Sequence, residues 1–445
     1  PRIVGTLQRD GYRVEKLLLQ TQPGITMTAN AYVPDGPGKH AAVLCVHGHW
    51  RLAKSEPTVH SRCIGLAKLG FFVLMVDAFG AGERGIGPAL GEYHGEMVAA
   101  TLFPSNRPLS GVQVYENMRA VDYLQSRPEV DPDQIGITGA SGGGNQTMYA
   151  GAFDERFKCV VPVCSVGTYL AYLGAACCMG EVVPGALRFT EEWGMLSLVA
   201  PRALMVVNAT RDAFQFSVAE AKKSIEKAGH VFQLTGAEQN LRHAVFESKH
   251  DYNQSMREAM YGWMTLHLKG EGDGSPIPEP EFKVEDAEVL RCFPGDSRPE
   301  EFVTLPQFAT AQGREILSRR PLPMHAEHWE TEEMRMRETL PRLLGGIPRR
   351  GPIEPAPIVK TAPSGSDETI EFAPEAGITV FATRRRTTAK RRGVALLLNP
   401  ETARGEIDSD VSAELLAIGW DVVTADLRAT GSTDYPSDKI GRAPD

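Results

Sequence analysis

The most informative stretch of the chain is Ile135–Gly144, IGITGASGGG, which reads as a short buried strand that turns sharply into a helix. It holds the pattern G-x-S-x-G, with Ser141 between Gly139 and Gly143, and NQTMYAGAF follows with helical spacing. A serine thrust outward on so tight a turn crowds its neighbours, so the residues two before and two after it must lack a Cβ atom. The free N–H groups of the following helix would face an oxyanion formed beside the serine. The stretch predicts a nucleophile at Ser141, and a structural glycine turn is the competing interpretation.

Length and composition indicate an ordinary globular protein with two or three domains. The chain has 445 residues, of which 42% are hydrophobic and 23% are charged. Its formal net charge of −9 argues against nucleic acid or an anionic membrane as the main partner. The longest apolar runs, AAVLCV and GFFVLMV, have the length of buried strands and fall short of the roughly 18–20 residues that span a bilayer. We therefore expect neither a nucleic-acid nor a membrane partner.

The cysteines and histidines give no metal-site pattern. The seven cysteines include no C-x-x-C pair and no Cys/His ligand spacing, which argues against zinc. The adjacent Cys177 and Cys178 favour loop packing over a redox role. His47 and His49 form an H-x-H pair without a third ligand nearby, so loop packing is again favoured over metal binding. We expect no metal and no cofactor. The chain opens at Pro1 without a methionine, which suggests a trimmed product, and the sequence assigns no compartment.

The first 270 residues alternate strand and helix signals, which predicts an α/β fold with a mostly parallel sheet covered by helices on both faces. This succession is typical of the α/β-hydrolase fold, in which catalytic groups lie on loops at the carboxyl ends of strands. The expected strands are YRVEKLLLQT and ITMTANAYV as an antiparallel opening pair, then AAVLCVHG, FFVLMVDAF, QIGITGA, CVVPVCSVG, RALMVVNAT and VFQLTG.

The texture changes after residue 270. GEGDGSPIPEPE reads as a linker rich in proline, glycine and acidic residues, and HWETEEMRMRETLPRLLGG reads as an amphipathic helix. We expect a catalytic domain at residues 1–270, a linker with a helical segment at 271–366, and a partial second domain at 367–445.

The expected second domain partly repeats the first. AAVLCVHG is echoed by GVALLLNP, and LAKLGFFVLMVDAFGAGE by LLAIGWDVVTADLRATGS. A glycine precedes an aspartate by seven residues in both copies, and another glycine follows five residues later. The spacing predicts a duplicated fold whose second copy lacks a nucleophile elbow. The residues concerned are Gly70, Asp77 and Gly82 in the first copy and Gly419, Asp426 and Gly431 in the second.

A basic run lies between two expected strands of the second copy, at the place that PDGPGK occupies in the first. It could bind a polyanion, but a solvated hairpin turn is the favoured interpretation. The run consists of Arg384, Arg385, Arg386, Lys390, Arg391 and Arg392.

A serine nucleophile needs a base and an acid that orients the base. In this fold the partners follow the serine in the order acid, then histidine. Asp212 comes just after the strand RALMVVNAT and is the expected acid, although an acid at a helix N-terminus is the alternative. His250 lies before the last helix and is the expected base, with His243 as the fallback. Asp251 is expected to point elsewhere and to cap that helix.

The oxyanion needs two N–H donors, and the substrate needs a binding surface. Gly142 directly follows the nucleophile and should supply one donor. The loop CVHGHW should supply the other through the backbone of His49, with Trp50 as the runner-up. Trp50, Trp193 and Tyr252 are candidates for lining a sugar-binding cleft, although core packing explains such aromatic residues equally well.

These motifs resemble the acetyl xylan esterase-like branch of the α/β-hydrolases, which is related to dienelactone hydrolase and to the catalytic domains of prolyl oligopeptidases. The resemblance implies ester hydrolysis, often removal of acetyl groups from sugars or xylan, through an acyl-enzyme and without a cofactor. It also implies a triad of Ser141, Asp212 and His250. The chain has GAGERG and ASGGG where acetyl xylan esterases often carry R-G-Q-G and S-Q-G-G. A peptidase and a catalytically silent binding module are the alternatives. The resembling segments include VHGHWR, DAFGAGERG, YLQSRPEVDPDQIGITGASGGGNQT and KHDYNQSMREAMYGWM.

Overall fold

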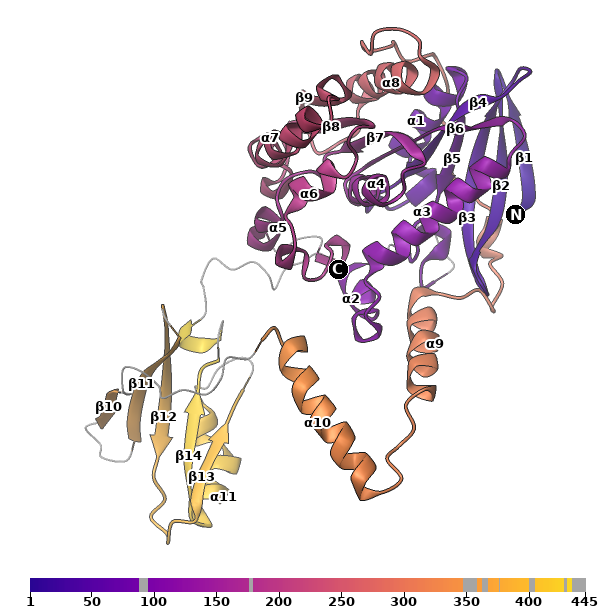
Figure 1. The fold of residues 1–445 in the computed structure, drawn as a ribbon. Coiled ribbons are helices and arrows are strands. Elements are labelled where there is room, and N and C mark those ends of the chain that lie inside the picture. The colour runs from indigo at the N-terminus through magenta and orange to yellow at the C-terminus, as the bar shows by residue number, and fades with distance from the viewer. Residues whose placement is uncertain are drawn as a thin grey trace. The chain divides into compact units, whose positions relative to one another are not determined.

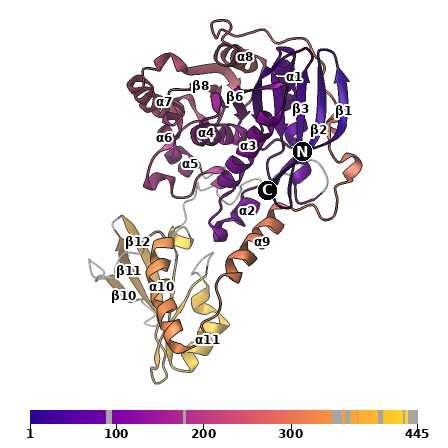
Figure 2. The ribbon, with the colours of Figure 1, turned by 45° about the vertical axis from the view of Figure 1, so that its right-hand side comes forward.

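The structure is a computed structural model in which the chain forms two compact units, Pro1–Pro321 and Leu322–Asp445 (Figures 1 and 2). Within its described part, no helix has the length and apolar character needed to cross a membrane. The described residues are 1–87, 95–175, 179–346, 358–361, 367–375, 377–399, 405–427 and 430–433.

The first unit contains a nine-stranded sheet that begins with antiparallel pairs and continues in parallel, as the sequence predicts. The first three pairings across the sheet are antiparallel, and the other five are parallel. In spatial order the strands are β1 (Arg2–Arg9), β2 (Tyr12–Gln22), β3 (Ile25–Pro34), β5 (Phe72–Val76), β4 (His40–Val46), β6 (Val130–Ala140), β7 (Phe157–Val163), β8 (Ala203–Arg211) and β9 (Leu241–Lys249).

Helices cover both faces of this sheet (Figure 1). Successive side chains of a strand point to opposite faces, so Val43 and Cys45 enter one apolar core while Ala42 and Leu44 enter the other. Helices α1 and α8 complete the first core, and α3, α4, α6 and α7 complete the second. The helices are α1 (Pro57–Lys68), α2 (Gly95–Ala100), α3 (Leu109–Ser126), α4 (Gly142–Phe153), α5 (Tyr169–Ala175), α6 (Glu192–Ser197), α7 (Val218–Leu234), α8 (Gln254–Lys269) and α9 (Leu305–Ser318).

One predicted strand is wrong. The segment VFQLTG lies at the end of α7, and the last strand of the sheet is β9, which follows it. The side chains of Ala221, Ala228 and Phe232 are buried at helical spacing, and the Ser217 side chain caps the start of the helix. The phenylalanine therefore serves the apolar face of a helix, although both valine and phenylalanine favour strands.

Residues 271–321, expected to begin the linker, pack onto the first unit. Leu290 is fully buried in a core of that unit. The backbone N–H of Cys292 donates to the Glu83 carboxylate at 2.8 Å. The ring of Phe308, on α9, lies 5.4 Å from that of Phe79. The domain boundary expected at residue 270 is thus corrected to Pro321.

The second unit repeats the strand order of the first five strands of the chain. Its order is β10-β11-β12-β14-β13, which matches β1-β2-β3-β5-β4, and β13 pairs with β14 in parallel as β4 pairs with β5. In the described sheet β13 is an edge strand, and its Val394 and Leu396 side chains are exposed. The elements of this unit are α10 (Ala326–Leu343), β10 (Ile358–Thr361), β11 (Asp367–Glu375), β12 (Ile378–Arg385), β13 (Gly393–Leu397), α11 (Asp410–Ala417) and β14 (Trp420–Ala425).

The two copies also share a local glycine–aspartate contact. Gly82 and Gly431 both have positive φ, at +57° and +54°. A methyl group on Gly82 would collide with the Asp77 carboxylate, and one on Gly431 would collide with the Asp426 carboxylate. The same turn thus follows β5 and β14, which agrees with the predicted duplication.

The basic run does not form the expected hairpin. It connects β12 to β13, and β14 lies between these two strands. Arg384 and Arg391 pair with Asp421 at 2.5 and 3.1 Å, and Arg385 pairs with Asp367 at 2.7 Å. These side chains therefore form ion pairs within their own sheet.

Candidate active site

The tight turn predicted around Ser141 is present at the end of β6. Ser141 has φ +58° and ψ −128°, a strained conformation for a residue with a side chain. Its carbonyl accepts the N–H groups of Gly144 and Asn145 at 2.7 and 3.0 Å, which starts α4. A methyl group on Gly48 would lie 2.8 Å from the Ser141 Cβ atom. The turn therefore packs directly against the loop that follows β4.

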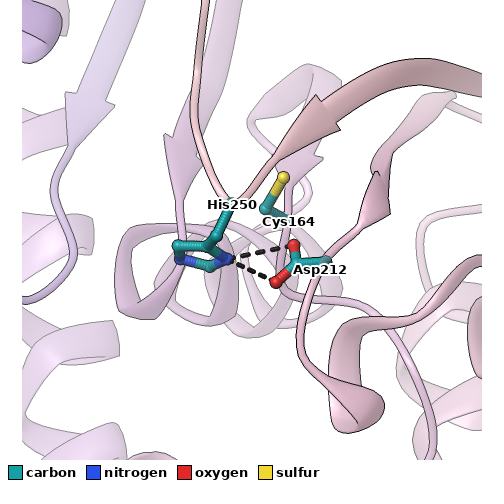
Figure 3. Close-up of side chains that lie close together, drawn as sticks. All are labelled: Cys164, Asp212 and His250. Carbon is teal, nitrogen blue, oxygen red and sulfur yellow. Dashed lines mark hydrogen bonds and ion pairs between the residues drawn. The ribbon is translucent and has the colours of Figure 1, made fainter.

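Asp212 and His250 form a hydrogen-bonded pair (Figure 3). Asp212 directly follows β8, and His250 lies between β9 and α8. The His250 Nδ1 atom lies 2.8 and 3.0 Å from the two Asp212 carboxylate oxygens. The Asp212 side chain is fully buried, whereas the His250 side chain is 35% exposed. A carboxylate at Nδ1 fixes the ring and leaves Nε2 to exchange a proton.

The carboxyl ends of parallel strands meet at one edge of a sheet, and this edge carries the three predicted catalytic residues. Ser141 follows β6, and the pair Asp212 and His250 follows β8 and β9, with β7 between. The fallback base His243 lies within β9, and its Nε2 atom is 3.0 Å from the Asn208 side-chain oxygen. Burial lowers the pKa of His243. The structure therefore favours His250 as the base.

Two residues beside the pair were not found from the sequence. The Cys164 Sγ atom lies within 4.8 Å of ligand atoms of Asp212 and His250 and donates to the Asp251 carbonyl at 3.3 Å. Burial raises the pKa of the Cys164 thiol to about 12, so it stays protonated. The Phe216 ring stacks on the His250 ring with centroids 5.6 Å apart. The sequence gives no local signal for these two residues, because they approach the pair only when the strands assemble into the sheet.

Two predictions for the loop after β9 are wrong. Tyr252 is fully buried, and its hydroxyl lies 2.9 Å from the Thr138 Oγ1 atom. It is a core residue that anchors the loop, and it cannot line a substrate cleft. The side chain of Asn253, rather than that of Asp251, caps α8 by accepting the N–H of Met256 at 3.2 Å.

The change Tyr252→Phe is expected to lower the free energy of unfolding by about 1 kcal/mol, because it removes one buried hydrogen bond while keeping the ring. Activity per folded molecule should change less than twofold. Urea unfolding followed by circular dichroism measures the first quantity, and initial rates measure the second. A substrate contact would instead appear as a higher KM with unchanged stability.

The loop after β4 uses its ring nitrogens for packing. The His47 Nδ1 atom lies 2.7 Å from the Gly48 carbonyl, and its Nε2 atom accepts the Ala78 N–H at 3.1 Å. Burial lowers the pKa of His47. The N–H of Trp50, the runner-up donor, points to the Gly48 carbonyl at 2.8 Å. His49 therefore remains the better candidate for the second oxyanion donor.

A buried carboxylate that the sequence analysis missed lies beside the expected oxyanion hole. Glu181 is 3% exposed. One of its oxygens lies 3.0 Å from His49 Nε2, and the other accepts the Asn145 side-chain N–H at 2.9 Å. A methyl group on Gly142 would collide with this carboxylate. Gly142 therefore has to be a glycine for this contact as well as for the turn.

A cavity of about 520 Å³ is lined in part by Val182, the residue that follows Glu181 in the chain. Most of its other lining residues are apolar, and Arg107 is its one charged group among the described lining residues. Trp50 and Trp193 are partly buried elsewhere, so the predicted aromatic residues do not line it. The lining residues are Phe103, Asn106, Arg107, Pro108, Tyr169, Leu173, Val182, Val183, Pro184, Gly185, Ala186 and Leu187.

The sheet order, the strained serine turn and the hydrogen-bonded pair of Asp212 and His250 are those of an α/β-hydrolase fold. Residues 104–181 match the model of the prolyl oligopeptidase family. Among solved structures, the methylesterase BT1017 superposes with a TM-score of 0.55 and 23% identity, over 71% of this chain and 69% of that one.

Curated relatives match shorter stretches of the chain. Over 100 residues, the chain is 38% identical to YtaP of Bacillus subtilis, a protein provisionally named a hydrolase. This match covers 22% of this chain and 31% of that protein. The chain is 28% identical over 146 residues to the uncharacterised protein PA2218 of Pseudomonas aeruginosa, which covers 33% of this chain and 35% of that protein. The chain thus spans about a third of the length of the curated relatives it matches.

Proposed function

We propose that this protein is a serine esterase that hydrolyses short-chain esters, foremost acetyl esters of a carbohydrate such as xylan, without a cofactor, nucleic acid or membrane. The hydrogen-bonded pair of Asp212 and His250, at the same sheet edge as the strained Ser141, is the observation that carries the proposal. The proposed substrate class rests on the sequence segments that resemble acetyl xylan esterases, although GAGERG and ASGGG differ from the motifs common in those enzymes.

The proposed reaction is acyl transfer in two steps. His250 takes the proton of Ser141 as the serine oxygen attacks the ester carbonyl. The backbone N–H groups of Gly142 and His49 bind the resulting oxyanion. Asp212 holds the imidazole through Nδ1 and stabilises its positive charge. His250 then protonates the leaving alcohol, and it later activates the water that releases the acid.

A hydrolysis screen tests this proposal. Acetylated xylan, acetylated monosaccharides, methyl uronate esters and p-nitrophenyl esters are compared, with Ser141→Ala as the control. The proposal predicts acetate release from the sugars and a substrate preference that disappears in the variant. Cleavage of methyl uronate esters without acetate release would support esterase activity but reject acetyl esters as the substrate.

A peptidase is the second candidate, because residues 104–181 match the prolyl oligopeptidase family. A panel of proline-containing peptide anilides against p-nitrophenyl acetate separates the two. Labelling of Ser141 by a fluorophosphonate would reject the third candidate, a catalytically silent module.

The cavity makes a prediction about acyl length. Leu173 and Leu170 are both exposed on α5, but only Leu173 lines the cavity. If the cavity holds the acyl chain, Leu173→Asp should lower the hexanoate-to-acetate ratio of kcat/KM by about tenfold, because apolar contacts to a few methylenes are lost. The matched control Leu170→Asp should change that ratio less than twofold. Equal ratios in both variants would place the acyl chain elsewhere.

A further inference from the structure

We propose that Glu181 is a positioning residue that holds the backbone of His49 in place as an oxyanion donor. This inference rests on the proposed esterase function and adds to it a residue outside the triad. Glu181 would not touch the reacting atoms itself, and it would act through the loop that follows β4.

The two expected donors come from separate parts of the chain. Gly142 begins α4, and His49 lies on the loop after β4. An oxyanion hole works only if both N–H groups are fixed before the reaction, to within about 0.5 Å. Something must therefore tie the loop to the helix.

Glu181 ties these two segments together. One carboxylate oxygen lies 3.0 Å from the His49 Nε2 atom on the loop. The other accepts the side-chain N–H of Asn145, in the first turn of α4, at 2.9 Å. The same carboxylate packs so closely on Gly142 that a methyl group there would collide with it. One side chain thus contacts both donor-bearing segments.

The orientation of Asn145 is itself fixed. The Tyr172 hydroxyl donates to the Asn145 side-chain oxygen at 2.9 Å. That hydroxyl also lies 3.1 Å from the Ser165 carbonyl, next to Cys164. With its oxygen bound to Tyr172, the Asn145 amide has to present its N–H to Glu181.

Burial makes this arrangement exacting. The Glu181 side chain is 4% exposed, so water cannot readily replace a lost donor. A buried carboxylate without hydrogen-bond donors is strongly disfavoured. Glu181 receives the His49 contact only when the loop lies against α4, so its need for donors favours that loop position.

A double-mutant cycle tests the proposal. We would measure kcat and KM on p-nitrophenyl acetate for the wild type, Glu181→Ala, His49→Ala and the double variant, with rates per active site counted by fluorophosphonate titration. The His49→Ala variant keeps its backbone N–H and loses only the imidazole. Each single change should lower kcat about 100-fold, near the cost of losing one oxyanion donor, while KM changes less than threefold.

The cycle gives a clear alternative outcome. If Glu181 acts through His49, the double variant should be at most threefold slower than either single variant. Losses that multiply to about 10⁴-fold would overturn the proposal, as would a Glu181→Ala variant with kcat within threefold of the wild type.

Two conservative variants separate positioning from folding. Glu181→Gln keeps the size of the side chain and one acceptor, but its amide places a second donor against the Asn145 N–H. We therefore expect an intermediate loss in kcat of about tenfold. This variant replaces Glu181→Ala in the test if Glu181→Ala does not fold. His49→Gln keeps a donor toward Glu181 and should be at least fivefold faster than His49→Ala. No recovery would overturn the proposal.

The control is Glu15→Ala. Glu15 on β2 is as buried as Glu181 and pairs with Arg127 at 2.7 Å. Its loss should reduce stability and leave kcat within twofold. Failure of this inference is distinct from failure of the proposed function: activity that persists in Ser141→Ala rejects the function, whereas a dead Ser141→Ala with an additive cycle rejects only the role of Glu181.

Discussion

The change Ser141→Ala should lower kcat on p-nitrophenyl acetate by about 10⁶-fold, because members of a triad act as one unit and the nucleophile cannot be bypassed. The side chain is partly exposed at the end of β6, so its loss opens no cavity in the core. Stability should therefore change little, and the strained φ of +58° at this position remains a property of the turn.

Initial rates and fluorophosphonate labelling measure the effect. The variant should also show no burst of p-nitrophenol in the first turnover, because no acyl-enzyme forms. More than a few per cent of the wild-type rate in a folded variant would contradict the assignment. Failure of the fluorophosphonate to label the wild type would also contradict the assignment.

The change Asp212→Asn is expected to lower kcat by about 10⁴-fold, the size seen when a triad acid becomes an amide. The carboxylate now accepts from His250 Nδ1 with oxygens at 2.8 and 3.0 Å. An amide can present its N–H there instead, which would place the histidine proton on Nε2 and prevent it from accepting the serine proton. The structure should be retained, because the two side chains have the same size.

Asp251→Asn is the matched control for this second change. Asp251 is adjacent to His250 in the chain, but its carboxylate accepts the N–H of Tyr252 at 2.7 Å. Its amide oxygen can do the same, so kcat should stay within threefold. If the two variants lose activity equally, the acid has been assigned to the wrong residue.

What could be predicted from the sequence was carried by local patterns. The serine turn needs glycines at fixed offsets, and buried parallel strands are continuous apolar runs, so both show in the letters. The order of acid and histidine after the elbow then identified Asp212 and His250, which the structure brings into contact. The strand VFQLTG was wrong because its apolar residues also fit one face of a helix, and nothing within six letters separates the two.

The rest depends on contacts between distant segments. Tyr252 was predicted to line a cleft because the sequence does not show that its hydroxyl forms a buried hydrogen bond with Thr138. Glu181 had no local signal, since its partners His49 and Asn145 lie far away in the chain. Cys164 similarly reaches the acid–histidine pair only because β7 lies beside β8.

The outer strand of the repeated half-sheet has a practical consequence. Leu44 on β4 is fully buried, whereas its counterpart Leu396 on β13 is 58% exposed, and β13 offers an open edge in the described sheet. Edge strands of this kind promote aggregation, since unpaired backbone groups and exposed aliphatic side chains can pair with other chains. Light scattering of concentrated solutions should therefore increase with time, and the change Leu396→Lys should prevent this increase.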